Sequence, residues 1–198
     1  AASTFKILNS LIAQDEGAVS GPDEVLVCDG HHYDIADWNQ NHTLASAYKA
    51  SCVWCYQVIA SRIDPKKYQA HIQRAGYGQL AEPFDPTHFW LDGSLKISAL
   101  EQVEFLRKLV NRSLPYKPAS YDALRDIMVI EKNDSYTIRA KTGWATSSTL
   151  QAGWYVGYVE TKHGAWLFAL NMDISDKSQL PLRQQITEQS LRKMKIIR

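Results

Sequence analysis

The stretch from residue 136 to residue 174 most constrains the fold, because its pattern differs from that of everything before it. Its segments "YTIRAKTG", "QAGWYVGYVETKHG" and "AWLFALNMDIS" alternate and are rich in aromatic and β-branched residues. Such segments, joined by short turns, predict three consecutive antiparallel strands. Helical patterns precede them, and the closing segment "PLRQQITEQSLRKMKIIR" predicts one more helix. The order predicts an α+β fold in which helices cover an antiparallel sheet.

The part of the chain before residue 133 carries apolar residues at helical spacing. The predicted helices are 3–19, 42–63 (a helix pair or a broken helix), 64–78, 94–114 and 120–132. Ser3 is a candidate N-cap of the first helix, and Gly17 is a candidate stop. We therefore expect a single domain without a linker, with a helical part at about 3–132 and the sheet and closing helix at about 133–198.

Charge and length exclude several classes of partner. The 198 residues carry a net charge of +1, which does not indicate binding to nucleic acid. No apolar run approaches the roughly 20 residues that span a membrane, so no membrane span is expected. The oligomeric state stays open between monomer and homodimer.

Ser3 and Lys6 are the first candidates for chemistry. Three positions apart on a helix, their side chains share one face. A serine hydroxyl needs a base to become a nucleophile, and a lysine buried among apolar groups has a lowered pKa. The free N–H groups at the start of a helix can also stabilise an oxyanion. Alone, this pair is more often an ordinary helix start.

A second pattern, Lys141-Thr142-Gly143, lies in a predicted strand. Lysine and threonine side chains can bind a carboxylate, and a strand glycine permits close approach of a ligand or another backbone. Taken alone, a Lys-Thr-Gly pattern is more often the exposed end of an ordinary strand than part of a binding site.

Together the patterns resemble class D serine β-lactamases, the oxacillinase family. The chain carries "STFK", "SCV", "YGQ", "WLDG" and "KTG" in the order of that family's motifs, followed by "GWYVGYVE", "FALNMDIS" and "LPLR". The resemblance covers essentially the whole chain. It implies the serine β-lactamase/transpeptidase-like fold, with an antiparallel sheet flanked by helices plus an all-helical region.

The resemblance also implies roles. Ser3 would be acylated by the β-lactam carbonyl, and Lys6, carboxylated by carbon dioxide, would be the general base. Ser51 would relay a proton to the leaving nitrogen with help from Lys141. The other implied roles are carbamate support by Trp90 and Val53, an oxyanion hole from the backbone N–H groups of Ser3 and Trp144, and substrate binding by Thr142, Gly143 and Arg183. The resemblance implies no cofactor or metal ion besides the carbon dioxide-derived group on Lys6.

Two features depart from the family pattern. Gln79 replaces the asparagine of Tyr-Gly-Asn, so Tyr77 and Gln79 are expected near the site without an assigned role. The family also has two strands and a short helix before its Ser-Thr-Phe-Lys motif. Without them, a bare sheet edge is expected along strand 153–160 or 165–174. This predicts a fragment of a longer enzyme, a hypothesis that intact-mass measurement tests.

Rival functions differ at the middle motif. Class A β-lactamases have Ser-Asp-Asn there and transpeptidases Ser-x-Asn, whereas this chain has Ser51-Cys52-Val53. The serious alternative is the sensor domain of a β-lactam receptor, which is acylated but does not turn over. Sensors place a polar residue at position 53, so Val53 favours a hydrolase.

The cysteines and histidines raise two further hypotheses, a redox-active cysteine pair and a metal site. Cys52 and Cys55 match a thioredoxin-like Cys-x-x-Cys pattern, but two buried thiols on a helix are favoured. Cys28 has no evident partner. A metal site built from "HHYD" (31–34) and His42 matches no compact ligand set, so scattered surface histidines are favoured. The resemblance to class D β-lactamases implies a periplasmic or secreted enzyme that hydrolyses β-lactams and so provides antibiotic resistance.

Overall fold

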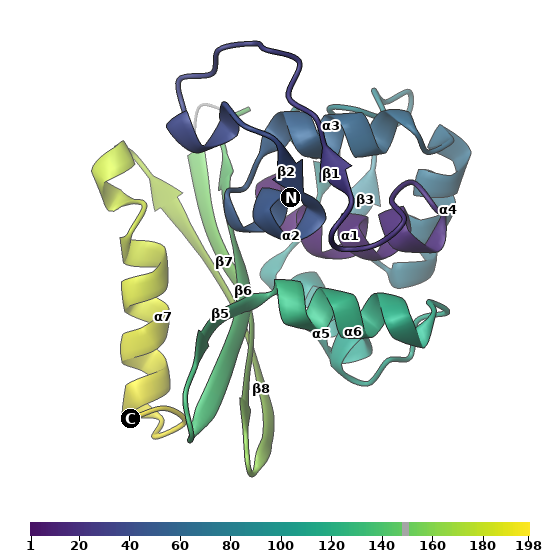
Figure 1. Cartoon of the computed structure of the whole chain (residues 1–198). Helices are drawn as coiled ribbons and strands as arrows, with labels where there is room; N and C mark the ends of the chain where they lie inside the picture. Colours follow the sequence, from purple (N-terminus) through teal and green to yellow (C-terminus); the bar gives the residue numbers. More distant parts are fainter. Residues whose placement is uncertain (148–150) are drawn as a thin grey trace.

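The structure is a computed structural model that describes residues 1–147 and 151–198 (Figure 1). A helical region packs against one face of an antiparallel sheet, and α7 (Leu182–Lys193) covers the other face. The predicted α+β fold is confirmed. The predicted helices at 42–63 and 64–78 are confirmed as α2, α3 and α4, and the first of these patterns is a helix pair.

The helical region holds most of the short elements. Its helices are η1 (Ala2–Phe5), α1 (Lys6–Asp15), η2 (Ala36–Trp38), α2 (Leu44–Lys49), α3 (Val53–Ser61), α4 (Pro65–Ala75), α5 (Ala99–Val110) and α6 (Pro118–Ile127). Two small strand pairs join its loops, β1 (Val25–Leu26) with β2 (His42–Thr43) and β3 (Gln79–Leu80) with β4 (Leu95–Lys96). A last short helix, η3 (Lys177–Gln179), precedes α7.

Local sequence explains where several of these helices begin and end. Thr43 and Ser98 close capping boxes at the starts of α2 and α5. Pro65 occupies the first turn of α4, and Gly76 ends that helix in the left-handed conformation that favours glycine.

The sheet contains four antiparallel strands in the order β5-β6-β7-β8. They are β5 (Val129–Lys132), β6 (Tyr136–Ala145), β7 (Gln151–Thr161) and β8 (Gly164–Ile174). The register between β6 and β7 is regular from Tyr136↔Thr161 to Ala145↔Ala152. The three predicted strands are confirmed as β6, β7 and β8.

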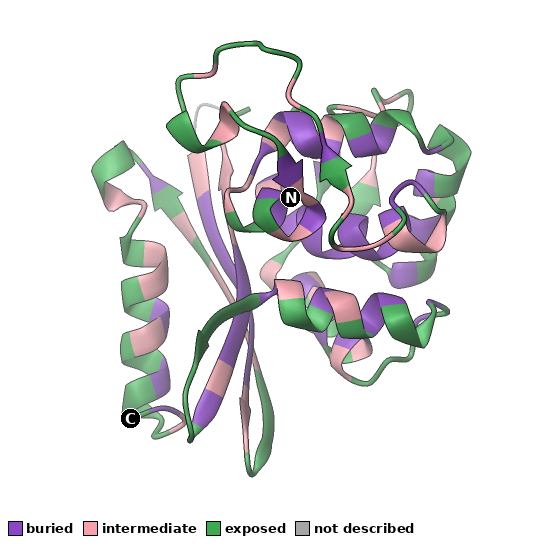
Figure 2. Cartoon of the chain, viewed as in Figure 1, coloured by how far each residue is buried: buried purple, intermediate pink, exposed green. Residues whose placement is uncertain are grey.

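Alternation along the strands divides the core into two clusters. Trp154, Val156 and Tyr158 of β7 face the helical region and join its large core. Tyr155 and Val159 face α7 and join a smaller cluster with Leu191 and Ile197. In Figure 2 the buried residues gather where the helices meet the sheet.

Three local predictions were wrong. Ser3 is not an N-cap but lies inside η1, and no side chain caps α1. The predicted helix 94–114 begins only at Ala99, after β4. The predicted helix 120–132 ends at Ile127, and Val129–Lys132 adds a fourth strand to the sheet.

The bare edge expected on the sheet lies at β8. Within the described residues β8 pairs with β7 alone, whereas β7 is paired on both sides. None of the helices described is long and apolar enough to cross a membrane.

Candidate active site

The centre of the site is the junction of η1 and α1. Lys6 Nζ donates a hydrogen bond to Ser3 Oγ at 3.1 Å. Helical spacing across this junction places the two side chains on the same face, as the sequence predicts. The nucleophile candidate and its candidate base are therefore already in hydrogen-bond contact.

The surroundings of Lys6 lower its affinity for a proton. The residue is 1% exposed, and its Nζ lies 4.9 Å from the centre of the Tyr56 ring. Burial lowers the pKa of Lys6 well below its usual value, and the positive charge of Lys141 lowers it further. An uncharged amine is the form that can accept the Ser3 proton.

Strand β6 packs directly against the nucleophile turn through Gly143. A Cβ at this position would lie 3.0 Å from Thr4 Cγ2 and 3.3 Å from both Thr4 N and Trp154 Cβ. Only a glycine leaves β6 this close to η1 without displacing a neighbour. The two distant motifs are thereby joined into one site.

Lys141 is the second buried lysine. It is 4% exposed, and its Nζ donates to Thr142 O at 3.1 Å and lies 5.6 Å from the centre of the Tyr48 ring. Burial, and then the charge of Arg183, lower the pKa of Lys141 to about 7. Near neutral pH this side chain is divided between its charged and neutral forms.

Ser51 lies in the turn between α2 and α3. Its φ is 54°, its N–H donates to Tyr48 O at 3.1 Å, and the next N–H, of Cys52, donates to Ala47 O at 2.9 Å. This pattern is a Schellman motif whose left-handed position usually holds glycine. A serine there costs about 1–3 kcal/mol, which is typical of functional positions. Val53 follows as the first residue of α3 and is half-buried.

Trp90 lies under the nucleophile turn. It is 2% exposed and stacks on Phe5 with ring centroids 6.0 Å apart. Its indole N–H is buried without a hydrogen-bond partner among the described residues. A buried donor left unpaired is costly, so it marks a place for an acceptor.

β5 pairs with β6 only as far as Arg139, so the second half of β6 continues past the start of β5. Among the described residues, the last bond on this side is donated by Ala140 N–H to Met128 O, directly before β5. The register stays regular to Ala145, so the N–H groups of Thr142 and Trp144 face the same edge. The Trp144 amide that the resemblance implies for an oxyanion hole therefore points toward this edge.

Arg183 reaches the site from α7. Its Nη1 donates to Gly143 O at 2.7 Å and its Nε to Leu180 O at 2.6 Å. This side chain is brought to the strand from 40 positions away in sequence. Thr142, the residue before Gly143, is half-buried, and its Oγ1 lies 3.4 Å from Lys141 Nζ.

The two residues without an assigned role differ in position. Tyr77 is buried and its hydroxyl lies 3.3 Å from Thr4 Oγ1, which also accepts from Gln102 Nε2 at 2.8 Å. Gln79 is exposed on β3, opposite Lys96.

Tyr48 and Tyr56 are contacts that the sequence analysis missed. Their rings lie under Lys141 and Lys6, and both residues are at most 2% exposed. The available signal was their spacing, three positions before Ser51 and three positions after Val53.

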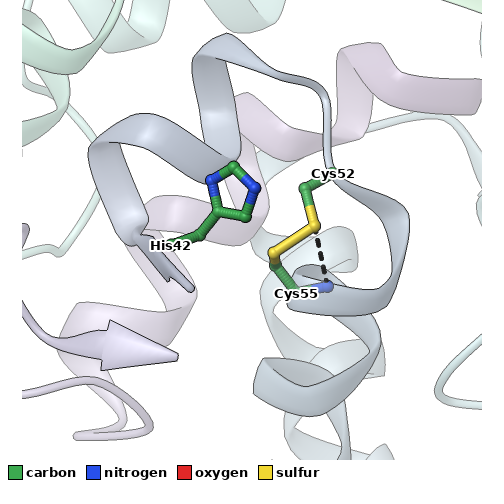
Figure 3. A group of neighbouring side chains, drawn as sticks. All are labelled: His42, Cys52 and Cys55. Carbon is green, nitrogen blue, oxygen red and sulfur yellow. Dashed lines mark hydrogen bonds between the residues drawn. A yellow bond between two sulfur atoms is a disulfide. The ribbon is translucent and has the colours of Figure 1, made fainter. Parts of the chain in front are cut away.

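The interpretation of Cys52 and Cys55 as two thiols was wrong, because they form a disulfide (Figure 3). Cys28 is a free cysteine. His42 is not a surface histidine. It is 3% exposed beside the disulfide, and its ring nitrogens lie 3.0 Å from Ser46 Oγ and 2.8 Å from Asp37 O.

A group of Asp15, Glu16 and His71 is the other cluster with metal-ligand chemistry among the described residues. Glu16 pairs there with His71 and Lys67. The hydrogen bond of Glu16 with His71 and its ion pair with Lys67 account for the contacts of Glu16 in this cluster.

Comparison with known proteins agrees with the motifs. The model of the penicillin-binding-protein transpeptidase domain matches residues 1–192. β-Lactamase OXA-48 of Klebsiella pneumoniae is 43% identical over 196 residues, covering 99% of this chain and 74% of the relative. The chain spans 62% of β-lactamase OXA-15 of Pseudomonas aeruginosa, at 38% identity.

Two further similarities bear on fold and on the sensor alternative. The crystal structure of FUS-1 (OXA-85), a class D β-lactamase of Fusobacterium nucleatum subsp. polymorphum, has a TM-score of 0.96 and 36% identity over 100% of this chain and 82% of that one. The regulatory protein BlaR1 of Bacillus licheniformis is 33% identical over 173 residues, which is 86% of this chain and 28% of that protein. By its motifs, its fold and these relatives, the chain belongs to the class D serine β-lactamases, within the penicillin-binding-protein transpeptidase family.

Proposed function

We propose that this chain hydrolyses the amide bond of β-lactams through an acyl-enzyme on Ser3 and so provides antibiotic resistance. The observation that carries the proposal is the buried Lys6 amine, whose pKa is lowered well below its usual value, 3.1 Å from Ser3 Oγ. That pair is an activated nucleophile rather than a solvated helix start.

The reaction starts with acylation. The Lys6 side chain accepts the Ser3 proton while Oγ attacks the β-lactam carbonyl carbon. The N–H groups of Ser3 and Trp144 would stabilise the oxyanion. As the carbon–nitrogen bond breaks, Ser51, assisted by the Lys141 ammonium, relays the proton held by the Lys6 side chain to the leaving nitrogen, which restores the base. The base then accepts a proton from a water molecule while that water attacks the ester carbonyl carbon. The bond to Ser3 Oγ breaks, and Oγ takes the proton back from the base.

The residues around Lys6 fit a carboxyl group on its amine. Carboxylation joins the neutral amine to carbon dioxide and releases one proton, so a lowered pKa favours it. The Trp90 indole N–H, which has no hydrogen-bond partner in residues 1–147 and 151–198, would donate to the new anion, and Val53 would keep water from it. When present, this group supplies the general base. The lowered pKa of Lys6, the Trp90 indole N–H and the apolar Val53 side chain support our proposal that Lys6 is carboxylated.

The substrate carboxylate has candidate partners on β6 and α7. Thr142 offers a hydroxyl, and the Arg183 guanidinium lies against Gly143 O at 2.7 Å. A guanidinium and a hydroxyl together suit a carboxylate. We propose that the substrate lies along the β6 edge with its carboxylate between these groups.

The sensor reading has one supporting observation, the similarity to BlaR1. The half-buried Val53 beside Ser51 favours hydrolysis, because an apolar neighbour favours a neutral, reactive lysine. The sensor is therefore the second candidate.

We also propose a periplasmic or extracellular location. The Cys52–Cys55 disulfide supports it, since disulfides persist in oxidising compartments. Cell fractionation tests this: the protein should be released with the periplasm or the medium.

The test of the function follows a chromogenic cephalosporin with and without bicarbonate. We expect sustained turnover that rises with bicarbonate in the parent and falls in Trp90→Phe, which lacks the indole donor. A single stoichiometric burst with a stable adduct on Ser3 would establish the sensor instead. No reaction at Ser3 at all would refute both functions.

A further inference from the structure

The Cys52–Cys55 disulfide lies inside the Ser51-Cys52-Val53 motif of the proposed active site. Cys52 is the N-cap of α3, and its Sγ accepts a hydrogen bond from Cys55 N at 3.3 Å (Figure 3). The bond closes a ring across the first turn of α3, and that ring contains Val53. One covalent link thus follows Ser51, the proposed proton relay, and encloses Val53, the residue proposed to support the Lys6 carbamate.

The turn at Ser51 needs such support. Its φ of 54° is one that side-chain-bearing residues rarely adopt. On the α2 side, the turn is held by the Ser51 N–H bond to Tyr48 O and by the Cys52 N–H bond to Ala47 O. On the α3 side, the disulfide fixes the backbone directly after Ser51. The two backbone bonds tie the turn to α2 only. The disulfide ties the other side of the turn to α3.

Burial excludes an exchange function for this disulfide. Both cysteines are 0% exposed, although a Cys-x-x-Cys pair at a helix start is typical of redox proteins. The His42 ring lies beside them, and Trp54, whose ring centroid is 6.1 Å from that of His42, is 7% exposed. A protein thiol cannot reach these sulfurs, so the disulfide acts within its own chain.

We propose that the Cys52–Cys55 disulfide is a positioning element for β-lactam turnover. It holds Ser51 and Val53 where proton relay and the state of Lys6 require them. The inference rests on the proposed function. Loss of the bond should therefore change the chemistry at Ser3 and Lys6, and not only the stability of the fold.

The test compares the parent with Cys52→Ala/Cys55→Ala, with Cys28→Ala as the matched control that removes the free thiol. Rates are taken per site titrated by acylation of Ser3. We expect kcat of the double variant to fall about 10- to 100-fold, as displaced catalytic groups do, with a small change in KM. It should also need more bicarbonate for half-maximal activity, because the Val53 wall is loosened.

Reduction of the parent gives a second route should the double variant not fold. A small dithiol in mild denaturant supplies two electrons and two protons, leaves two thiols on the protein and is itself oxidised to a disulfide. Alkylation should then modify all three cysteines instead of Cys28 alone. The reduced parent should show the same loss of kcat.

The outcomes separate this proposal from the function. If kcat and the bicarbonate dependence are unchanged and only the melting temperature falls, the disulfide is a structural crosslink and the proposal is refuted. If the parent is acylated but does not turn over, the acylation rate replaces kcat as the readout. If the parent is not acylated at all, the proposed function fails and this inference fails with it.

Discussion

The start of α1 and the middle of β6 each bury a lysine, but the two surroundings differ. Lys6 contacts the Ser3 hydroxyl, and its pKa is lowered well below its usual value by burial and then by Lys141. Lys141 contacts two oxygens of Thr142, and burial and then Arg183 lower its pKa to about 7. Burial alone therefore does not assign a role. The partner of each amine carries the proposal that Lys6 is the base, because its amine contacts the Ser3 hydroxyl, whereas Lys141, with a pKa of about 7, is proposed to support proton transfer to the leaving nitrogen.

The largest expected effect comes from removing the base. Lys6→Ala should lower kcat/KM by about 10²- to 10⁴-fold, the usual contribution of a general base. The exposed Lys66→Ala on α4 is the control and should leave kcat/KM unchanged. Steady-state hydrolysis of a chromogenic cephalosporin measures both. A greater loss in Lys141→Ala than in Lys6→Ala would reverse the assignment of the two lysines.

The next effect is on stability. The pKa of Lys141 is about 7 in the folded chain and about 10.5 in the unfolded one. Between these pH values the unfolded chain binds more protons, so the free energy of unfolding rises with pH, by on the order of 5 kcal/mol from this group. Lys6 acts in the same direction.

Urea unfolding across that pH range measures the slope. Lys141→Met should flatten the slope, because it removes the titrating group without removing the buried side chain. An equal slope in this variant would show that Lys141 keeps an ordinary pKa.

Much of the sheet was predictable because its signal is local. The residues of β6, β7 and β8 are rich in aromatic and β-branched types over ten or eleven consecutive positions, and a short turn joins β7 to β8. β5 was missed because all four of its residues are exposed, so no burial pattern separates "VIEK" from the preceding helix. β5 forms through its backbone hydrogen bonds to β6, so its own residues carry no hydrophobic pattern that predicts a strand.

The site was predictable in its motifs and less so in its geometry. The order of the motifs identified Ser3, Lys6 and Lys141. The left-handed backbone conformation of Ser51 could not be predicted, because serine rarely adopts it. The disulfide was missed because an i, i+3 pair within a helix keeps its sulfurs apart. Cys52 lies outside α3 as its N-cap, and this backbone brings the sulfurs together.

A smaller effect concerns the contact that joins the two lysine regions. Gly143→Ala places a Cβ 3.0 Å from Thr4 Cγ2 and 3.3 Å from Thr4 N. Such overpacking costs about 1–3 kcal/mol, and moving Thr4 should also displace Ser3 and slow its acylation. Thermal unfolding and the acylation rate measure the two effects. Gly21→Ala, where an added Cβ meets nothing within 4 Å, is the control. An unshifted acylation rate would show that β6 does not position the nucleophile.

The smallest effect tests the second cause of the lowered pKa of Lys141. Arg183→Gln removes a positive charge, so the pKa of Lys141 should rise from about 7. The plot of kcat/KM against pH, which reports groups of the free enzyme, should move its falling limb upward, while KM rises through loss of the carboxylate partner. Arg192→Gln, exposed on the same helix, should move neither. A raised KM with an unmoved limb would mean that burial alone sets the pKa of Lys141. The two lysines would then differ only in the depth of burial of each amine and in the oxygen atom that each amine contacts.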